Sequence, residues 1–261
     1  MTPSAQTAVD LQDVTMRFGN YVALDQVALR IQEGEFVAIV GPTGCGKSTL
    51  LNIMAGLLSP SAGRVYIFGQ ALQGLNRQAG YLFQQDALLP WKTATDNVGA
   101  GLLFRGMSLS QSRERARVWL EKVGLQGFEQ HYPHQLSGGM KKRVSLAQTL
   151  ILNPRLLLMD EPFSALDIQT RQLMENELLR LWQEEAKSVC FITHDLEEAI
   201  ALADRVIVFS AGPAAHPIGD FPIPLARPRD VAEVRLTETF LEIYREIWSI
   251  LRGEVLKSYA R

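Results

Sequence analysis

The sequence predicts an α/β fold: a mixed, mainly parallel sheet with an antiparallel β subdomain, an inserted helical subdomain and a short C-terminal helix. Strand-like apolar runs alternate with helical segments along most of the chain. A continuous apolar run at 36–40 ends in a glycine-rich loop that opens into a helix. The alternation stops after Gln84 and returns near residue 137, which indicates a helical insertion at about 86–135.

The composition predicts one globular unit that acts on a membrane only through partners. The 261 residues include 26 Lys and Arg against 28 Asp and Glu, so no basic surface for nucleic acid is expected. No apolar run approaches the roughly 18 residues that a membrane span needs. The first ten residues lack a basic start followed by an apolar stretch, so we expect no secretory signal. Cys45 and Cys190 lie far apart and are expected to be free thiols.

Apolar alternation predicts the elements of the N-terminal half. Two strands are expected within 9–31, and the run at 36–40 predicts a strand buried on both faces. Strand patterning resumes at 63–68 and 79–83. Ser108 and Gln111 have the spacing of a capping box, which predicts a helix over 113–123.

The C-terminal half returns to alternating strands and helices. We expect helices over 137–152, 168–185 and 196–202, and strands over 156–159, 189–193 and 206–209. Five prolines between 213 and 228 predict an extended surface segment rather than a packed element. A last amphipathic helix is expected over 237–251. These elements predict a catalytic domain over 8–235, which includes the insertion, and a helical tail over 236–261.

The segment GPTGCGKST at 41–49 predicts a phosphate-binding loop and hence a P-loop NTPase core. Its glycines let backbone N–H groups turn toward phosphate oxygens at the positive end of the following helix. Lys47 adds a charge for the terminal phosphates, and Ser48 offers a hydroxyl to Mg²⁺. The predicted nucleotide-binding residues of this loop are Gly41, Pro42, Thr43, Gly44, Cys45, Gly46, Lys47, Ser48 and Thr49.

Two carboxylates follow the apolar run at 156–159. At the C-terminal edge of a parallel sheet, Asp160 and Glu161 would face the bound nucleotide. Asp160 is placed to hold Mg²⁺ through water, and Glu161 to orient and partly deprotonate the attacking water. This pair predicts an NTP hydrolase.

A second helix end that suits an anion begins at LSGGM, residues 136–140. Ser137, Gly138 and Gly139 stand at the start of a predicted helix, whose N-terminus attracts phosphate. One nucleotide has a single terminal phosphate group. Two phosphate-seeking helix ends in one chain therefore suggest that two copies, facing opposite ways, grip each nucleotide.

In this order the motifs resemble those of the nucleotide-binding subunit of an ABC transporter, and the resemblance covers nearly the whole chain. It implies that Phe18 stacks on adenine, with Tyr21 as an alternative. It also implies that Gln84 senses Mg²⁺ and the membrane subunit, with Gln85 as an alternative. The segment 136–140 resembles the signature motif.

The resemblance also assigns two loops beside the predicted hydrolytic residue. Residues 164–167 are similar to the D-loop, so Asp167 is expected at the nucleotide site. His194 resembles the switch histidine, and its place after the strand at 189–193 suits a contact with the γ-phosphate and the attacking water. His131, His134 and His216 lack such placement, and no ligand spacing suggests a metal site.

Two departures from the family pattern are present. The signature motif usually ends in glutamine and here ends in Met140. Because Ser137 and the glycine amides would supply the phosphate contacts, we expect activity to survive. Residues 147–149 read Ala-Gln-Thr where relatives usually carry an arginine, which we expect to affect local packing or a salt link.

The resemblance further implies ATP and Mg²⁺ as ligands, a head-to-tail dimer with a second copy or a paralogue, and two membrane-spanning permease subunits. It places the chain at the cytoplasmic face of the inner membrane, indirectly serving a solute-binding protein. The LLPW at 88–91, the LSGGM variant and the proline-rich tail resemble importers of nitrate, sulfonate and taurine. Trp91 suits either a local core or a groove for a partner helix.

Three other functions remain open from the sequence. They are the ATPase of an ABC exporter, an ABC ATPase without a transport role, and a non-catalytic regulatory module. The chain has one cassette and no sustained heptad pattern, which disfavours a non-transport ABC protein. The presence of both Lys47 and Glu161 disfavours a non-catalytic module.

Overall fold

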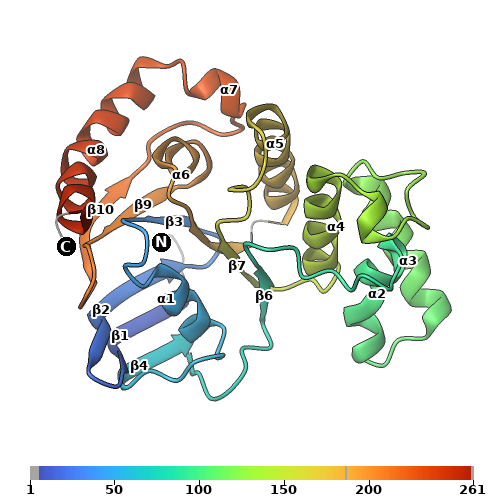
Figure 1. Ribbon diagram of the computed structural model, residues 1–261, viewed down its shortest axis with the longest axis horizontal. Coiled ribbons are helices and arrows are strands. Elements are labelled where there is room, and N and C mark those ends of the chain that lie inside the picture. Colours follow the sequence, from blue (N-terminus) through green and yellow to red (C-terminus); the bar gives the residue numbers. More distant parts are fainter. Residues whose placement is uncertain (1–5, 186, 260–261) are drawn as a thin grey trace, which may run out of the picture.

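The structure, a computed structural model, describes residues 6–185 and 187–259 (Figure 1). Residues 1–5, half of the segment from which we expected no secretory signal, lie outside the described part. Among the described residues, no helix is both long and apolar enough to cross a membrane.

The core sheet, as far as the chain is described, has six strands in the order β10-β9-β3-β8-β7-β6. All neighbouring strands are parallel except β10, which pairs antiparallel with β9. The strands are β3 Phe36–Val40, β6 Ala79–Leu82, β7 Leu156–Asp160, β8 Ser188–Ile192, β9 Arg205–Phe209 and β10 Pro217–Pro222.

Strand β3 lies at the centre of the molecule and is fully buried, as predicted. Its alternate side chains enter two different cores: Phe36 and Ala38 pack in one, Val37 and Ile39 in the other. This follows from the two-residue period of a strand whose two faces are both covered. The uninterrupted apolar run therefore marks the strand that carries the glycine-rich loop. Cys45 and Cys190 are both free, as predicted, and both are buried.

An antiparallel sheet covers one face of the core sheet, which confirms the expected antiparallel β subdomain. In the described residues its strand order is β2-β1-β4-β5. It shares a core with the helix α1, which follows the glycine-rich loop. The bounds are β1 Thr7–Phe18, β2 Tyr21–Gln32, β4 Ala62–Ile67, β5 Gln70–Ala71 and α1 Lys47–Met54.

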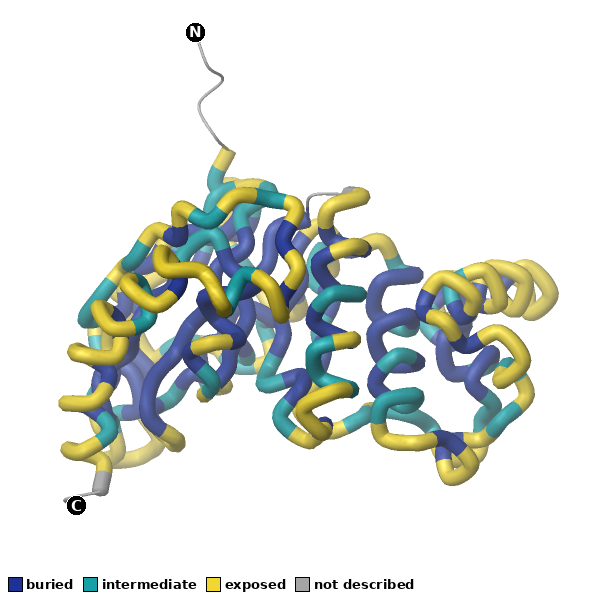
Figure 2. Tube along the Cα trace, turned by 90° about the horizontal axis from the view of Figure 1, so that it is seen from above, coloured by how far each residue is buried: buried dark blue, intermediate teal, exposed yellow. Residues whose placement is uncertain are grey.

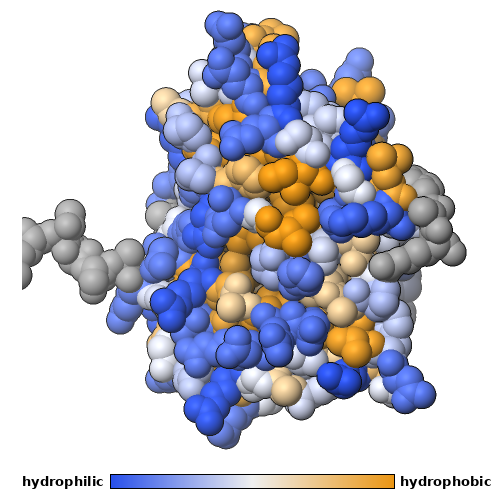
Figure 3. All heavy atoms as spheres, turned by 90° about the vertical axis from the view of Figure 1, so that its left-hand side faces the viewer, coloured by the Kyte–Doolittle hydropathy of each residue, from blue (hydrophilic) through white to orange (hydrophobic). Residues whose placement is uncertain are grey.

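Helices cover the other face of the core sheet (Figure 1). Their apolar side chains join those of Phe36, Ala38 and Val40 in the larger core. The helices are α5 Ile168–Glu185, α6 Leu196–Leu202, α7 Val231–Val234 and α8 Glu238–Tyr259. On the side formed by α8, small groups of apolar side chains are separated by hydrophilic ones (Figure 3).

A helical lobe lies beside β6 and β7, away from α1 and the antiparallel sheet (Figure 1). It consists of α2 Ala94–Phe104, α3 Leu109–Lys122, a 3-10 turn Pro133–Gln135 and α4 Gly138–Leu150. Helix α3 begins four residues before the predicted start because Ser108 caps it, accepting a hydrogen bond from the backbone N–H of Gln111 at 3.3 Å. The buried residues of these helices face one another, and the exposed ones line the outside of the lobe (Figure 2).

One prediction for the C-terminal part was wrong, and the predicted C-terminal helix is present but ends later than expected. The segment 212–228 contains a packed strand, β10, with Pro217 opposite Phe209 and Pro222 opposite Arg205. Proline is tolerated there because β10 is an edge strand and both prolines lie at its ends. Helix α8 continues eight residues beyond the predicted end at 251. Its last turns are held by Glu254, which accepts a hydrogen bond from the Ala211 backbone N–H at 2.7 Å.

Candidate nucleotide-hydrolysis site

The glycine-rich loop joins β3 to α1 and surrounds the head of Lys47. The Lys47 ammonium donates hydrogen bonds to the carbonyls of Gly41 (2.8 Å) and Pro42 (2.9 Å) and is only 5% exposed. Gly46 caps α1 at φ +105°, and a Cβ there would lie 3.0 Å from Leu24 Cδ2. Only glycine suits that position. The loop therefore places a fixed cation beside the backbone N–H groups that open α1.

Ser48 and Asp160 lie together at the start of α1 and the end of β7. The Ser48 hydroxyl donates to Asp160 Oδ1 at 3.0 Å. Burial raises the pKa of Asp160, and the hydrogen bond from Ser48 partly offsets this. The two side chains offer hard oxygen ligands on one side of the phosphate-binding loop, a donor set that fits Mg²⁺.

The Glu161 carboxylate joins two loops that are distant in the sequence. Its Oε2 accepts a hydrogen bond from Gln84 Nε2 at 3.1 Å and lies 3.1 Å from His194 Nδ1. The backbone of Glu161 has φ +43°, which is uncommon for a residue with a side chain. The Glu161 N–H donates to Ile192 O at 2.9 Å, which ties this strained residue to β8. The structure thus brings Gln84, Glu161 and His194 together.

The remaining predicted site residues lie at other edges of the molecule. Phe18 and Tyr21 face each other at the end of the β1–β2 hairpin and are 49% and 48% exposed, so both aromatic rings stay available for adenine. Ser137 caps α4, accepting from the Met140 backbone N–H at 3.3 Å. Asp167 caps α5, accepting from the Thr170 N–H at 3.0 Å, and this bond lowers the pKa of Asp167.

The two helix ends predicted to bind phosphate do not meet within one chain. Helix α1 packs on β7 and β8, whereas α4 packs with α2 and α3 in the helical lobe (Figure 1). Gly138 and Gly139 open α4, and Gly138 is exposed. The structure therefore leaves Ser137 and Gly138 exposed at the start of α4, separate from the Lys47 loop.

Comparison with known proteins assigns the family. The sequence model described as "ABC transporter" matches residues 24–164. An uncharacterised ABC transporter ATP-binding protein of Methanocaldococcus jannaschii is 48% identical over 242 residues, which is 92% of this chain and 88% of that protein. The chain belongs to the ABC transporter family. It is an ATP-binding subunit, with the ATP hydrolysis coupled to transport that defines such subunits.

Further relatives indicate which branch of the family this ABC ATPase resembles. A taurine import ATP-binding protein of Yersinia pestis is 47% identical over 191 residues, 73% of this chain and 75% of that protein. A nitrate import ATP-binding protein of Synechococcus elongatus is 46% identical over 215 residues, 81% and 78% of the two chains. The subunit is therefore similar in sequence to ATP-binding subunits named for taurine import and nitrate import.

A solved structure agrees with the fold of this ABC ATPase. It is described as a dimeric post-hydrolysis state of an ATP-binding cassette bound to ADP and Pi. It is 36% identical, with a TM-score of 0.74, and the match covers 84% of this chain and all of that one. The P-loop NTPase fold predicted from the sequence is confirmed.

Two residues of the ABC ATPase site were missed by the sequence analysis. The Tyr81 hydroxyl lies 3.5 Å from Asp160 Oδ2, and burial raises the pKa of Tyr81. Lys142 is 3% exposed, and its ammonium donates to the carbonyls of Phe83 (3.3 Å) and Gln84 (3.1 Å). Lys142 also pairs with the carboxylate of Asp86 at 3.2 Å. The signature helix α4 is thereby tied to the segment that carries Gln84.

A groove of about 370 Å³ opens between the core sheet and the helical lobe. Phe104, on its wall, is 84% exposed. Gln85, the alternative to Gln84, faces this groove rather than being bonded to Glu161. Gln148 and Thr149, from the stretch that departs from the family pattern, also line it. Other lining residues include Phe83, Ala87, Leu89 and Gly101.

The loop beside the groove presents Trp91 to solvent. Trp91 is 71% exposed, so the alternative of a local core role for it was wrong. The buried side chain of Asn97 holds this loop: its amide donates to the carbonyls of Leu89, Lys92 and Thr93, and its oxygen accepts from the Leu89 N–H. An exposed tryptophan on a fixed loop is typical of a protein contact.

A buried carboxyl group lies on α6, the helix that follows His194. Glu198 on α6 is 3% exposed and accepts a hydrogen bond from the Thr193 hydroxyl. Burial raises the pKa of Glu198 to about 8, with smaller contributions from Glu175 and Asp195. The folded protein therefore keeps a proton that the unfolded chain releases near the ordinary glutamate pKa of 4.5.

Replacement of Glu198 by Gln is expected to flatten the pH dependence of stability. A raised carboxyl pKa contributes stability that is fully present below about pH 4.5 and is lost as the pH rises through about 8. The free energy of unfolding of Glu198→Gln, measured in urea across this range, should rise relative to that of the wild type as the pH increases. The exposed neighbour Glu197→Gln is the control. A constant difference between Glu198→Gln and wild type would contradict this assignment.

Proposed function

We propose that this chain is the ATP-hydrolysing subunit of an ABC importer that powers uptake of a small solute such as nitrate, taurine or another sulfonate. It would act through two separate membrane-spanning permease subunits at the cytoplasmic face of the membrane. The observation that carries the proposal is the segment 83–87. Gln84 contacts the hydrolytic Glu161, while Phe83, Gln85 and Ala87 line the groove. A partner docked there would touch the segment that senses the nucleotide.

ATP would bind with its phosphates over the glycine-rich loop. The third N–H of the Lys47 ammonium contacts Cys45 Sγ only weakly, at 3.8 Å. This N–H would instead donate to a phosphate oxygen of bound ATP. Phe18 would stack on adenine. Ser48 and Asp160, with Gln84, would hold Mg²⁺, which neutralises phosphate charge when bound.

Glu161 would act as the general base in hydrolysis. The Gln84 amide and the His194 imidazole both contact Glu161 Oε2, so they fix the direction of the carboxylate. The free oxygen, Oε1, would accept the proton of the attacking water. His194 would donate from Nδ1 to this carboxylate, which leaves its other ring nitrogen for a contact with the nucleotide.

A second copy would complete each nucleotide site. Ser137, Gly138 and Gly139 open an outward-facing helix end, which suits the terminal phosphate held by another copy's Lys47 loop. Asp167 would lie at the same seam. The pairing would be head to tail, because each copy carries one loop and one signature segment.

The groove would receive a short helix of the permease. Apolar wall residues and the exposed Phe104 and Trp91 offer the anchors that helix-in-groove recognition uses. Phe104→Asp is expected to abolish co-purification with the permease subunits while the isolated chain still hydrolyses ATP. Leu236→Asp, at an exposed leucine outside the groove, is the control. Retention of the permease by Phe104→Asp would exclude this groove as the docking site.

Import can be tested with the assembled complex in liposomes. The chain is co-expressed with its permease and solute-binding protein, and phosphate release is measured with nitrate, taurine or an alkanesulfonate. We expect the solute-loaded binding protein, added to the outside, to stimulate hydrolysis and accumulate solute inside, and Lys47→Ala to remove both. Stimulation by solute presented on the nucleotide side, with release to the other side, would identify an exporter instead.

A further inference from the structure

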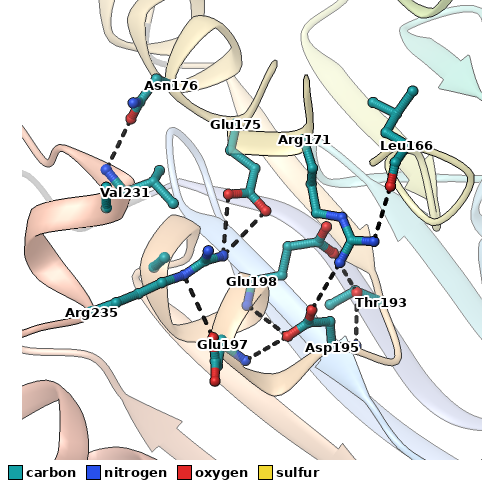
Figure 4. Close-up of polar contacts among 12 residues, drawn as sticks. Leu166, Arg171, Glu175, Asn176, Thr193, Asp195, Glu197, Glu198, Val231 and Arg235 are labelled. Atoms are coloured by element: carbon teal, nitrogen blue, oxygen red, sulfur yellow. Dashed lines mark hydrogen bonds and ion pairs between the residues drawn. The ribbon is translucent and has the colours of Figure 1, made fainter. Parts of the chain in front are cut away.

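Two helices begin directly after loops of the proposed hydrolysis site. Helix α5 follows the loop 161–167, which starts at Glu161, and α6 follows His194. Arg171, in the first turn of α5, contacts both loops (Figure 4). Its guanidinium donates to Asp195 Oδ2 at 3.2 Å and to Leu166 O at 3.3 Å. Asp195 is the residue next to His194.

Hydrogen bonds connect the loop of Glu161 and the loop of His194 in a closed ring. Within the loop 161–167, Ser164 bonds the Glu161 carbonyl at 3.1 Å, and the Leu166 N–H bonds Phe163 O at 3.1 Å. Arg171 then joins Leu166 to Asp195, and His194 returns to Glu161 at 3.1 Å. The loop of Glu161 and the loop of His194 are thus joined on two sides.

We infer that Arg171 is a positioning residue that holds the loop of His194 against Glu161 during hydrolysis. The inference rests on the proposed roles of Glu161 and His194. The His194 side chain is 53% exposed, so packing alone holds it weakly. The orientation of the imidazole depends on the backbone that carries it, which Arg171 restrains through Asp195.

Asp195 can transmit this restraint because both of its carboxylate oxygens accept hydrogen bonds. Oδ1 caps α6, accepting from the N–H groups of Glu197 (2.9 Å) and Glu198 (3.2 Å). Oδ2 accepts from Arg171. The carboxylate therefore couples the start of α6 to the start of α5, with His194 immediately before it.

The helix that carries Arg171, α5, is bonded to the C-terminal segment (Figure 4). One turn further along α5, the fully buried Glu175 pairs with Arg235 at 3.1 Å. Asn176 of α5 accepts from the Val231 N–H at 2.9 Å. These bonds hold α5 against α7. Because α5 carries Arg171, they also keep the Arg171 guanidinium in position to bond Asp195.

Arg171→Met is the direct test, because it keeps the apolar stem and removes the guanidinium. We expect kcat for ATP to fall about tenfold or more, as for a lost positioning contact. KM for ATP and Tm should stay near wild type, since the Lys47 loop is untouched and the ion pair is partly exposed. Arg171→Lys should recover part of the kcat.

Arg180→Met is the matched control on the same helix. Arg180 pairs with Glu177 and Glu184 on the exposed side of α5 and donates to Lys122 O at 3.0 Å, so its loss removes these contacts without touching either loop. Its kcat should equal that of the wild type. If Arg171→Met lowers kcat no more than Arg180→Met does, or lowers Tm and kcat together without rescue by lysine, the inference is wrong.

A double-mutant cycle tests whether Arg171 acts through Asp195, and Asp195→Asn probes the same contact without changing Arg171. Asp195→Asn can still cap α6 but loses its charge toward Arg171. It should lower kcat by itself, and Arg171→Met/Asp195→Asn should be no slower than the worse single variant. Additive losses would overturn the inference. His194→Ala separates the two proposals: if it leaves kcat unchanged, the role of His194 fails; if it lowers kcat while Arg171→Met does not, only the present inference fails.

Discussion

Glu161→Gln is expected to lower ATP turnover by about 100- to 10,000-fold, the usual contribution of a positioned general base. Glutamine has the same shape and keeps an oxygen for the contacts with Gln84 and His194, so ATP binding should persist. The variant loses only the capacity to accept the proton of the attacking water. Phosphate release in a single turnover, together with retention of ATP on gel filtration, measures the two properties separately.

Glu197→Gln provides the control for that experiment. Glu197 lies near the same loop, three residues after His194, but its side chain is largely exposed and capping depends only on its backbone N–H. Its turnover should match the wild type. A Glu161→Gln protein that hydrolyses ATP at the wild-type rate would place the base elsewhere.

Gly138→Asp is expected to prevent ATP-driven pairing of two copies and to lower turnover by at least about 100-fold, because a carboxylate would face the triphosphate in a low-dielectric seam. The chain itself should fold normally. A Cβ at Gly138 meets nothing within 4 Å, and an acidic residue in the first turn of α4 favours the helix. Sedimentation of the variant in the Glu161→Gln background, with and without ATP, measures the pairing.

Gly253→Asp is the matched control, because Gly253 also lies in a helix, α8, with open space around it. Gly139 would be a poorer choice for the test: a Cβ there would lie 2.6 Å from Thr170 Cγ2, so folding would be disturbed as well. If Gly138→Asp pairs on ATP as readily as Gly253→Asp, the signature segment does not contact the nucleotide.

Local patterns in the sequence were sufficient for the elements that carry the site. The apolar run at 36–40 and the glycine spacing after it define a strand, a loop and a helix within one short segment. Asp160 and Glu161 could be placed because parallel strands end at one edge of a sheet. The buried strand at 36–40 and the order of the motifs along the chain together were sufficient to predict the P-loop NTPase fold.

Contacts between distant segments could not be predicted in this way. Lys142 is an ordinary lysine in a helical pattern, and only the folded chain brings it to the carbonyl of Gln84. Arg171 meets Asp195 because α5 and α6 pack on the same face of the sheet. The prolines at 213–228 predicted an unpaired segment, and the sequence does not show that β10 lies at the edge of the sheet, where proline is tolerated.

The pairing of two copies around ATP is tested most directly by mixing two inactive variants. Both variants are made in the Glu161→Gln background. Lys47→Ala lacks the lysine of the phosphate-binding loop, and Gly138→Asp has a disabled signature segment. Neither variant alone should pair on addition of ATP. A mixture should form dimers with one bound ATP, since Lys47 of one copy and Gly138 of the other remain intact at one of the two sites. Failure of the mixture to pair, while the parent Glu161→Gln protein does, would contradict the account.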